Sequence, residues 1–212
     1  MYYFFRQIQQ MKKEATREKI HNAAKQCFIR YGLDKTTLED IAKAVGLNKA
    51  SLYYYFKSKE DIFLEVAIGE GEGFLNMLQA QTLQKEGTEK RVWFYMQERI
   101  NYYRNVLNVN RVSVDTLNKI LPRYFELFEI VQNKEIKFLS NLIKEGIKAG
   151  ELNKINTDKL ASALITMSDA LKHSLEQETA LRKEAEVDYS RCLSEIKLIV
   201  SLVFKGLSCR EA

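Results

Sequence analysis

Apolar residues recur three and four positions apart along almost the whole chain, and this spacing predicts helix nearly throughout. The first clear repeat follows Thr16, a residue type that caps helix N-termini, and stops at Gly32, a residue type that follows helix C-termini. We therefore expect a first helix between these two residues, with one buried face formed by Ile20, Ala23, Ala24, Cys27, Phe28 and Tyr31.

Two shorter helices joined by a turn are predicted next. Thr36 or Thr37 caps the second helix, and the third runs from about Lys49 to Phe56. A helix-turn-helix DNA reader needs a small residue where its helices cross, then a turn glycine, then an apolar anchor. Those places are taken by Ala42, Gly46 and Leu52, with Leu38, Ile41, Val45 and Leu47 as core residues. A helical hairpin with another role shares part of this spacing.

The third predicted helix presents a second, polar face. If Leu52 and Phe56 point inward, the arc carrying Lys49, Ala50, Tyr53 and Tyr54 faces outward. A phenol can donate to phosphate and pack on a sugar or a thymine methyl, and Lys49, Lys57 and Lys59 can neutralise phosphate charge. The competing interpretation is that the tyrosines pack against the protein itself, and this is stronger for Tyr55, which lies near the inner face.

The remaining residues predict a helical body. After a helix that starts at Ile62, Gly69-Glu70-Gly71-Glu72-Gly73 is either a soft point or a break in helix, and its spacing and glutamates exclude a phosphate loop. Later helices are expected over 88–108, from Pro122 to Gly150, over 157–178 and over 187–207.

A regulatory body needs a mostly apolar cavity with a few polar anchors. Apolar residues at helical spacing are more often core than pocket, so the candidate wall below competes with an ordinary core. The candidate ligand-binding residues are Trp93, Met96, Phe125, Phe128 and Met167, with Arg99 or Tyr103 to orient a polar group. His173 is either a ligand anchor, a pH-sensitive group or a solvated residue.

Charge separates the two parts of the chain. Residues 1–60 hold 12 lysines and arginines and 6 acidic residues, a net +6, which leaves −1 for the rest because the whole chain is +5. A basic first quarter favours an anionic partner, although an ordinary charged surface gives the same count. We expect a cytoplasmic protein, because the three cysteines show no paired spacing and the sequence shows no signal peptide or membrane span. Residues 1–13 are predicted to be a flexible N-terminal extension.

No catalytic set can be found in the sequence. It has two histidines, no HExxH, GxSxG, P-loop or dinucleotide motif and no paired cysteines, so neither enzymatic activity nor a cofactor or metal is expected. Chemistry based on carboxylates alone remains the enzymatic alternative.

Residues 36–62, TTLEDIAKAVGLNKASLYYYFKSKEDI, resemble the DNA-binding signature of the TetR/AcrR family of transcriptional regulators, and the likeness extends over about 14–66. The resemblance implies an all-α fold: a three-helix helix-turn-helix domain over 14–60, then a helical regulatory and dimerisation domain over 61–212. It further implies a homodimer, formed through the last two helices, that binds a palindromic operator. The expected DNA-binding residues are Thr36, Thr37, Asn48, Lys49, Ala50, Ser51, Tyr53, Tyr54, Tyr55, Lys57 and Lys59.

The family most often has His where this chain has Tyr55. The function expected from these observations is a repressor of double-stranded operator DNA that a small-molecule effector releases. The alternative is a DNA-binding regulator that a protein partner controls and that has no small-molecule pocket. A continuous, well-filled C-terminal core would favour the alternative.

Overall fold

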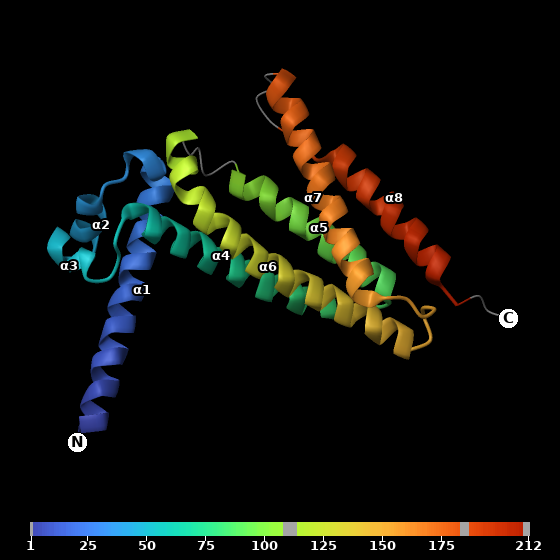
Figure 1. The fold of residues 1–212 in the computed structure, drawn as a ribbon, viewed down its shortest axis with the longest axis horizontal. Helices are drawn as coiled ribbons and strands as arrows, with labels where there is room; N and C mark the ends of the chain where they lie inside the picture. The colour runs from blue at the N-terminus through green and yellow to red at the C-terminus, as the bar shows by residue number, and fades with distance from the viewer. Residues whose placement is uncertain (1, 108–113, 183–186, 210–212) are drawn as a thin grey trace. The chain divides into compact units, whose positions relative to one another are not determined.

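The computed structural model describes residues 2–107, 114–182 and 187–209, and within these ranges all side chains except those of 2–4, 103–107, 114–128 and 180. The described residues form helices joined by short turns, with one isolated β-bridge between Leu152 and Ser208, which confirms the all-α prediction (Figure 1). The helices are α1 Tyr2–Lys35, α2 Leu38–Ala44, α3 Lys49–Tyr53, α4 Lys59–Leu83, α5 Thr88–Leu107, α6 Val114–Lys148, α7 Thr157–Arg182 and α8 Ser190–Leu207.

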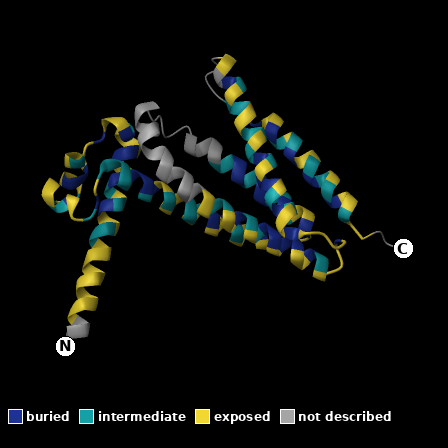
Figure 2. Cartoon of the chain, in the orientation of Figure 1, coloured by how far each residue is buried: buried dark blue, intermediate teal, exposed yellow. Residues whose placement is uncertain are grey.

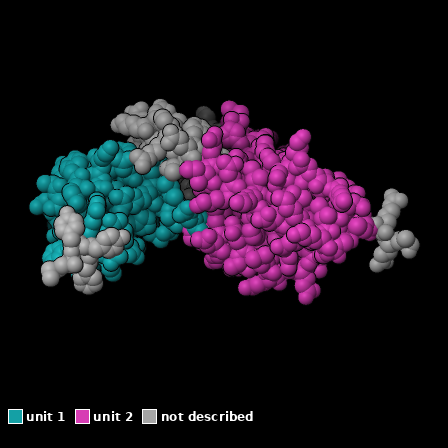
Figure 3. All heavy atoms as spheres, turned by 60° about the horizontal axis from the view of Figure 1, so that its bottom comes forward, with its two compact units in different colours: residues 1–72, 107–127 teal, residues 73–106, 128–212 magenta. Residues whose placement is uncertain are grey.

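The chain divides into two compact units (Figure 3). The N-terminal unit holds residues 1–72 and 107–127, and the C-terminal unit holds 73–106 and 128–212. The division falls inside α4, whereas the sequence suggested a boundary at residue 60, where that helix begins. The first half of α4 therefore packs as part of the N-terminal unit.

The N-terminal unit has its own apolar core. The buried face of α1 packs with α2, α3 and the start of α4 (Figure 2). The rings of Phe28 and Phe63 meet edge to face at 5.4 Å. Burying an aliphatic or aromatic side chain contributes about 1.5–3 kcal/mol, so this small cluster is enough to order three short elements. Its central residues are Ile20, Ala24, Cys27, Phe28, Ile41, Ala42, Leu52, Phe56, Ile62 and Val66.

The first helix is longer than predicted. It begins at Tyr2, and Thr16 is no N-cap, because its hydroxyl donates to the carbonyl of Lys12 one turn back. The residues before Thr16 contain no Gly or Pro to stop a helix, and propensity there outweighs the capping signal. Gly32 does break the helix, with φ 76° and ψ 164°. The flexibility expected for residues 1–13 stays a prediction.

Polar contacts fasten the first half of α4 along α1. Arg17 forms a bidentate ion pair with Glu65, and Lys25 Nζ lies 2.6 Å from Glu70 Oε2. Further along, α4 continues unbroken through the glycine-rich segment, which leaves a soft point rather than a break as the interpretation of this segment. Gly71 and Gly73 have open space where a Cβ would stand, and the soft point stays a prediction.

The C-terminal unit buries apolar side chains from α4 to α8 around Met96, Ile100, Leu139, Ile165 and Ile196. The prediction that Pro122 begins a helix was wrong, because α6 starts eight residues earlier at Val114. The segment before Pro122 keeps apolar residues at helical spacing, and a single lost backbone hydrogen bond did not end the helix there.

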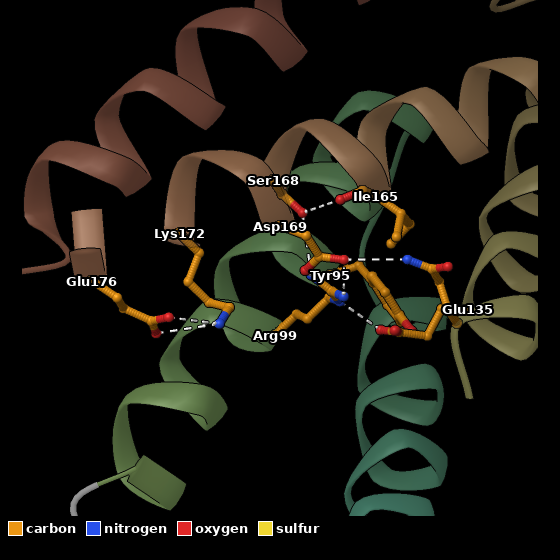
Figure 4. A network of polar contacts seen from close by, with 9 residues as sticks. Tyr95, Arg99, Glu135, Ile165, Ser168, Asp169, Lys172 and Glu176 are labelled. Atoms are coloured by element: carbon orange, nitrogen blue, oxygen red, sulfur yellow. Dashed lines mark hydrogen bonds and ion pairs between the residues drawn. The ribbon is translucent and has the colours of Figure 1, made fainter. Parts of the chain in front are cut away.

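A charged network crosses this core (Figure 4). The Arg99 guanidinium, on α5, donates to Glu135 Oε1 on α6 at 2.8 Å and to Asp169 Oδ1 on α7 at 2.7 Å. Tyr95 and Ser168 add hydrogen bonds at 3.1 and 3.2 Å. The Arg99 and Glu135 side chains are only 1% and 2% exposed and Asp169 is 22% exposed, so the network joins three helices and its Arg99–Glu135 pair is buried.

Candidate nucleic-acid interface

The second helix is fixed at its start by a capping box. Asp40 N donates to Thr37 Oγ1 at 3.1 Å, and Thr37 N donates to Asp40 Oδ2 at 2.9 Å. These bonds, the Thr37 side chain's first, hold the pKa of Asp40 below its usual value. Thr37 is exposed as predicted, but its hydroxyl also donates to Asp40, so a phosphate would have to replace that carboxylate.

The turn between α2 and α3 follows the predicted geometry. Gly46 has φ +70°, and Leu47 N donates to Ala42 O at 2.9 Å as the chain re-enters the core. Asn48 caps α3 by accepting a bond from Ser51 N at 2.7 Å. This hydrogen-bonded turn fixes the crossing of the two helices and, with it, the direction in which α3 faces.

The exposed end of α3 carries two tyrosines. Tyr53 and Tyr54 are 50% and 69% exposed, whereas Leu52 and Phe56 are 0% and 4% exposed. The helix ends at Tyr53, earlier than the predicted Phe56, and Tyr54 lies in the turn that follows. Ala50 is exposed beside them, so the surface combines a small residue with two phenols.

Lys49 is exposed but already paired. Its Nζ lies 2.5 Å from Glu39 Oε1 on α2. The hydrogen bond with Glu39 raises the pKa of Lys49, and the same bond lowers the pKa of Glu39. A DNA contact at Lys49 therefore requires exchange of one anion for another.

The two later lysines behave differently. Lys57 is exposed, as a phosphate contact requires. Lys59 is half-buried, and its Nζ donates to the carbonyls of Leu33 at 2.7 Å and Asp34 at 3.3 Å, at the end of α1. In this structure Lys59 caps α1, a role consistent with a cation beside helix C-terminal carbonyls.

Thr36 does not belong to the interface. It is 1% exposed, and its Oγ1 lies 2.7 Å from Gly32 O and 3.2 Å from Cys27 O. The prediction that Thr36 contacts DNA was therefore wrong, because its hydroxyl satisfies backbone carbonyls at the break in α1. Ser51 and Tyr55 are half-buried, and Tyr55 packs on the N-terminal core.

Two residues of α1 that the sequence analysis did not select lie against this surface. Lys13 Nζ is 5.0 Å from the centre of the Tyr54 ring, and Arg17 donates to Tyr55 O at 3.2 Å while stacking on Phe56. The helical spacing of Lys13 and Arg17 could have placed them on one face, but nothing local in the sequence places that face beside α3.

The candidate ligand residues are only partly described. Met96 is fully buried in the C-terminal core, and Trp93 and Met167 are half-buried at its edge. Arg99 is buried with two carboxylates already bound, which differs from an anchor open to a ligand. The side chains of Tyr103, Phe125 and Phe128 lie outside the described residues.

A pocket of about 420 Å³ lies elsewhere in the C-terminal unit. Its lining includes Glu86, Thr88, Glu151 and Phe204, and none of the candidate ligand residues takes part. Across the described ranges no group of His, Cys, Asp or Glu is arranged to hold a metal ion, and no described helix is long and apolar enough to cross a membrane.

Comparison with known proteins agrees with the geometry of the N-terminal unit. Residues 20–66 match the family of bacterial regulatory proteins, tetR family. The chain is 24% identical over 128 residues to the HTH-type transcriptional regulator QacR of Staphylococcus aureus, covering 54% of this chain and 68% of QacR. Over 47 residues, 22% of this chain and 25% of the relative, it is 51% identical to IcaR of the same species, a negative transcriptional regulator of the biofilm operon icaADBC.

A solved structure resembles the whole chain. The crystal structure of a transcriptional regulator from Cytophaga hutchinsonii superposes with a TM-score of 0.70 and 25% identity, covering 91% of this chain and 98% of that one. The likeness therefore includes the C-terminal unit as well as the DNA-binding signature, and the named relatives are transcription regulators.

Proposed function

Because residues 20–66 match the tetR family of bacterial regulatory proteins, we propose that this chain is a repressor of that family which binds a palindromic operator as a homodimer and is released by a small molecule. DNA binding is supported by the exposure of Tyr53 and Tyr54, at the end of the second helix of the helix-turn-helix, in a segment with a net positive charge. The negative regulator IcaR, similar over the DNA-binding segment, supports repression. Such a protein acts in the cytoplasm, where the operator is.

The DNA-binding test is a titration with the chain's own upstream duplex and a scrambled duplex at two salt concentrations. Sequence-selective binding that weakens with salt is expected. Tyr54→Ala should weaken operator binding by about 1–3 kcal/mol, the worth of one good base or backbone contact. Tyr31→Ala is the matched control, because Tyr31 is a 47% exposed tyrosine on α1 rather than on the reader. Equal effects of the two variants would contradict the assignment.

The dimer proposal is supported by an apolar surface on α8. Leu198 and Leu202, one turn apart, are 59% and 60% exposed. By contrast, Leu164 on α7 and Ile196 and Val200 on α8 are buried within the chain. At 100° per residue Leu198 and Leu202 lie on the side of α8 opposite Ile196 and Val200, so the exposed pair faces away from the intramolecular core.

The dimer can be tested by charge insertion. The double variant Leu198→Asp/Leu202→Asp should be monomeric in light scattering and should bind the operator weakly. Leu83→Asp, a 50% exposed leucine at the end of α4, is the control and should stay dimeric. A dimeric double variant would place the interface elsewhere.

Control by a protein partner is the second candidate. It is favoured by the filled core around Arg99, where the described residues include no buried side-chain N or O that lacks a hydrogen-bond partner. A cell extract that releases the protein from its operator can distinguish a small-molecule effector from a protein partner. Activity that survives protease but is lost on dialysis indicates a small molecule, and the opposite result indicates a protein.

A further inference from the structure

The N-terminal part of α1 has no packing role in the described core. The family match begins at residue 20, yet the helix continues back to Tyr2, and every side chain from residue 5 to residue 15 is exposed (Figure 2). Figure 1 shows this part of α1 running well past α2 and α3. Beyond the contact of Lys13 with the Tyr54 ring, no described side chain of residues 5–13 packs on the core, which raises the question of what this part of the helix contacts.

Its charge favours a polyanion. Arg6, Lys12 and Lys13 are cationic, and no acidic residue occurs before Glu14. The glutamines at 7, 9 and 10 add amide donors, which bind phosphate and sugar oxygens.

One face of this helix continues the tyrosine surface. At 3.6 residues per turn, Arg6, Gln10, Lys13 and Arg17 fall within an arc of about 60°. The contacts of Lys13 and Arg17 show which way this face of α1 points. Lys13 lies over the Tyr54 ring, and the Arg17 guanidinium donates to the backbone carbonyl of Tyr55. Arg6 and Gln10 therefore extend the side of α1 that meets the exposed end of the reader.

We propose that this face, defined by Arg6, Gln10 and Lys13, is an additional contact for double-stranded DNA, made to the phosphate backbone next to the Tyr54 contact. The proposal rests on the proposed DNA-binding function. Arg6 and Lys13 are separated by about 11 Å along the helix, close to the rise of three base pairs at about 3.4 Å each, so both can meet phosphates of one strand.

The other side of the same segment is apolar. Phe5 and Met11 are 67% and 68% exposed, and with Ile8 they lie opposite the cationic face. A second copy of the chain is the competing occupant that this surface suggests, and it predicts a change in oligomeric state rather than in DNA affinity.

The test compares two charge-matched double variants of the full chain. Arg6→Gln/Lys13→Gln removes two cations from the proposed face. Lys12→Gln/Lys19→Gln removes two exposed cations from the same helix, about 130–150° round from that face. Operator affinity is measured from 50 to 200 mM salt. The first variant should lower the slope of log affinity against log salt by about 1.8 per bound subunit, at about 0.9 per phosphate contact.

Between 50 and 200 mM salt, the loss of operator affinity should therefore be about 12-fold smaller per subunit for the first variant than for wild type. The control variant should keep the wild-type slope. An equal change in both variants, or none in the first, overturns the proposal. So does a first variant with the wild-type slope and an altered oligomeric state. Gln10→Glu provides a second test, because a carboxylate on this face should weaken binding, and unchanged affinity counts against the contact.

Failure of the underlying function gives a different result. If wild-type protein does not distinguish the operator from a scrambled duplex, the DNA-binding function itself fails. If wild type binds selectively and Arg6→Gln/Lys13→Gln binds with the same affinity and slope, only the α1 contact fails. Circular dichroism confirms that both double variants keep their helix content, as expected for exposed residues replaced by a good helix former.

Discussion

Replacing Arg99 with Met should be among the most destabilising single changes in the C-terminal unit. Methionine fills a similar volume but leaves the Glu135 carboxylate, 2% exposed, without its cation. Breaking a buried ion pair by removing one partner costs about 3–5 kcal/mol, because an uncompensated charge stays in the core. Here Asp169 also loses two hydrogen bonds, although that carboxylate, at 22% exposed, recovers some water.

The comparison variant is Arg182→Met. Arg182 pairs with Glu178 one turn away on α7, at 64% and 39% exposure, and such a surface pair contributes about 0–1 kcal/mol. The two variants remove the same charge and insert the same residue. Their difference therefore isolates the effect of burial.

Tryptophan fluorescence provides the assay, because Trp93 is the one tryptophan of the chain and lies in the C-terminal unit. Urea unfolding at a fixed protein concentration gives the free energy for each variant. A loss below about 1 kcal/mol for Arg99→Met would refute the reasoning, since it would mean that water reaches the network. Arg99→Met/Glu135→Leu should regain part of the loss, because it removes the unpaired carboxylate from the core, although the Tyr95 hydroxyl then loses its acceptor.

Three further predictions concern single positions. Gly146→Ala would bring a Cβ within 2.2 Å of a hydroxyl on α5 and should cost about 1–3 kcal/mol, whereas Gly71→Ala, in open helix, should stabilise α4 by up to about 1 kcal/mol in the same unfolding assay. Near pH 8 a thiol reagent should label exposed Cys209 first, because burial raises the pKa of Cys192 to about 11; fast native labelling of Cys192 would contradict this. Because the pKa of Asp40 is lowered in the fold, its stabilising effect should be present above about pH 4 and lost as pH falls further. The protection of the α2 amides, measured as their hydrogen-exchange rate relative to the intrinsic rate at each pH, should therefore fall in acid in wild type, and Asp40→Asn should not show this step.

The helix-turn-helix was predictable because local rules determine it. Gly46 needs a positive φ, Ala42 and Leu52 are buried, and a threonine caps α2, each at the place that short-range spacing indicated. The family resemblance gave the same result because it rests on those same residues.

What the sequence could not show has a common physical origin in contacts between distant residues. Thr36 looks like a cap or a phosphate ligand until the break at Gly32 turns its hydroxyl toward backbone carbonyls. Lys59 looks like a free cation until the fold brings the end of α1 to it. Arg99, taken for a ligand anchor, finds carboxylates that are 36 and 70 residues away along the chain.

The fastening of α4 to α1 limits how the DNA-binding unit can move. Contacts at Lys59, Glu65 and Glu70 hold successive turns of α4 against α1, and the residues between them are largely core. Up to Glu70 we therefore expect the two helices to move together. We therefore expect any bending of α4 to occur beyond Glu70, where Gly71 and Gly73 have open space around them, so that a signal along α4 would reorient the helix-turn-helix as one block.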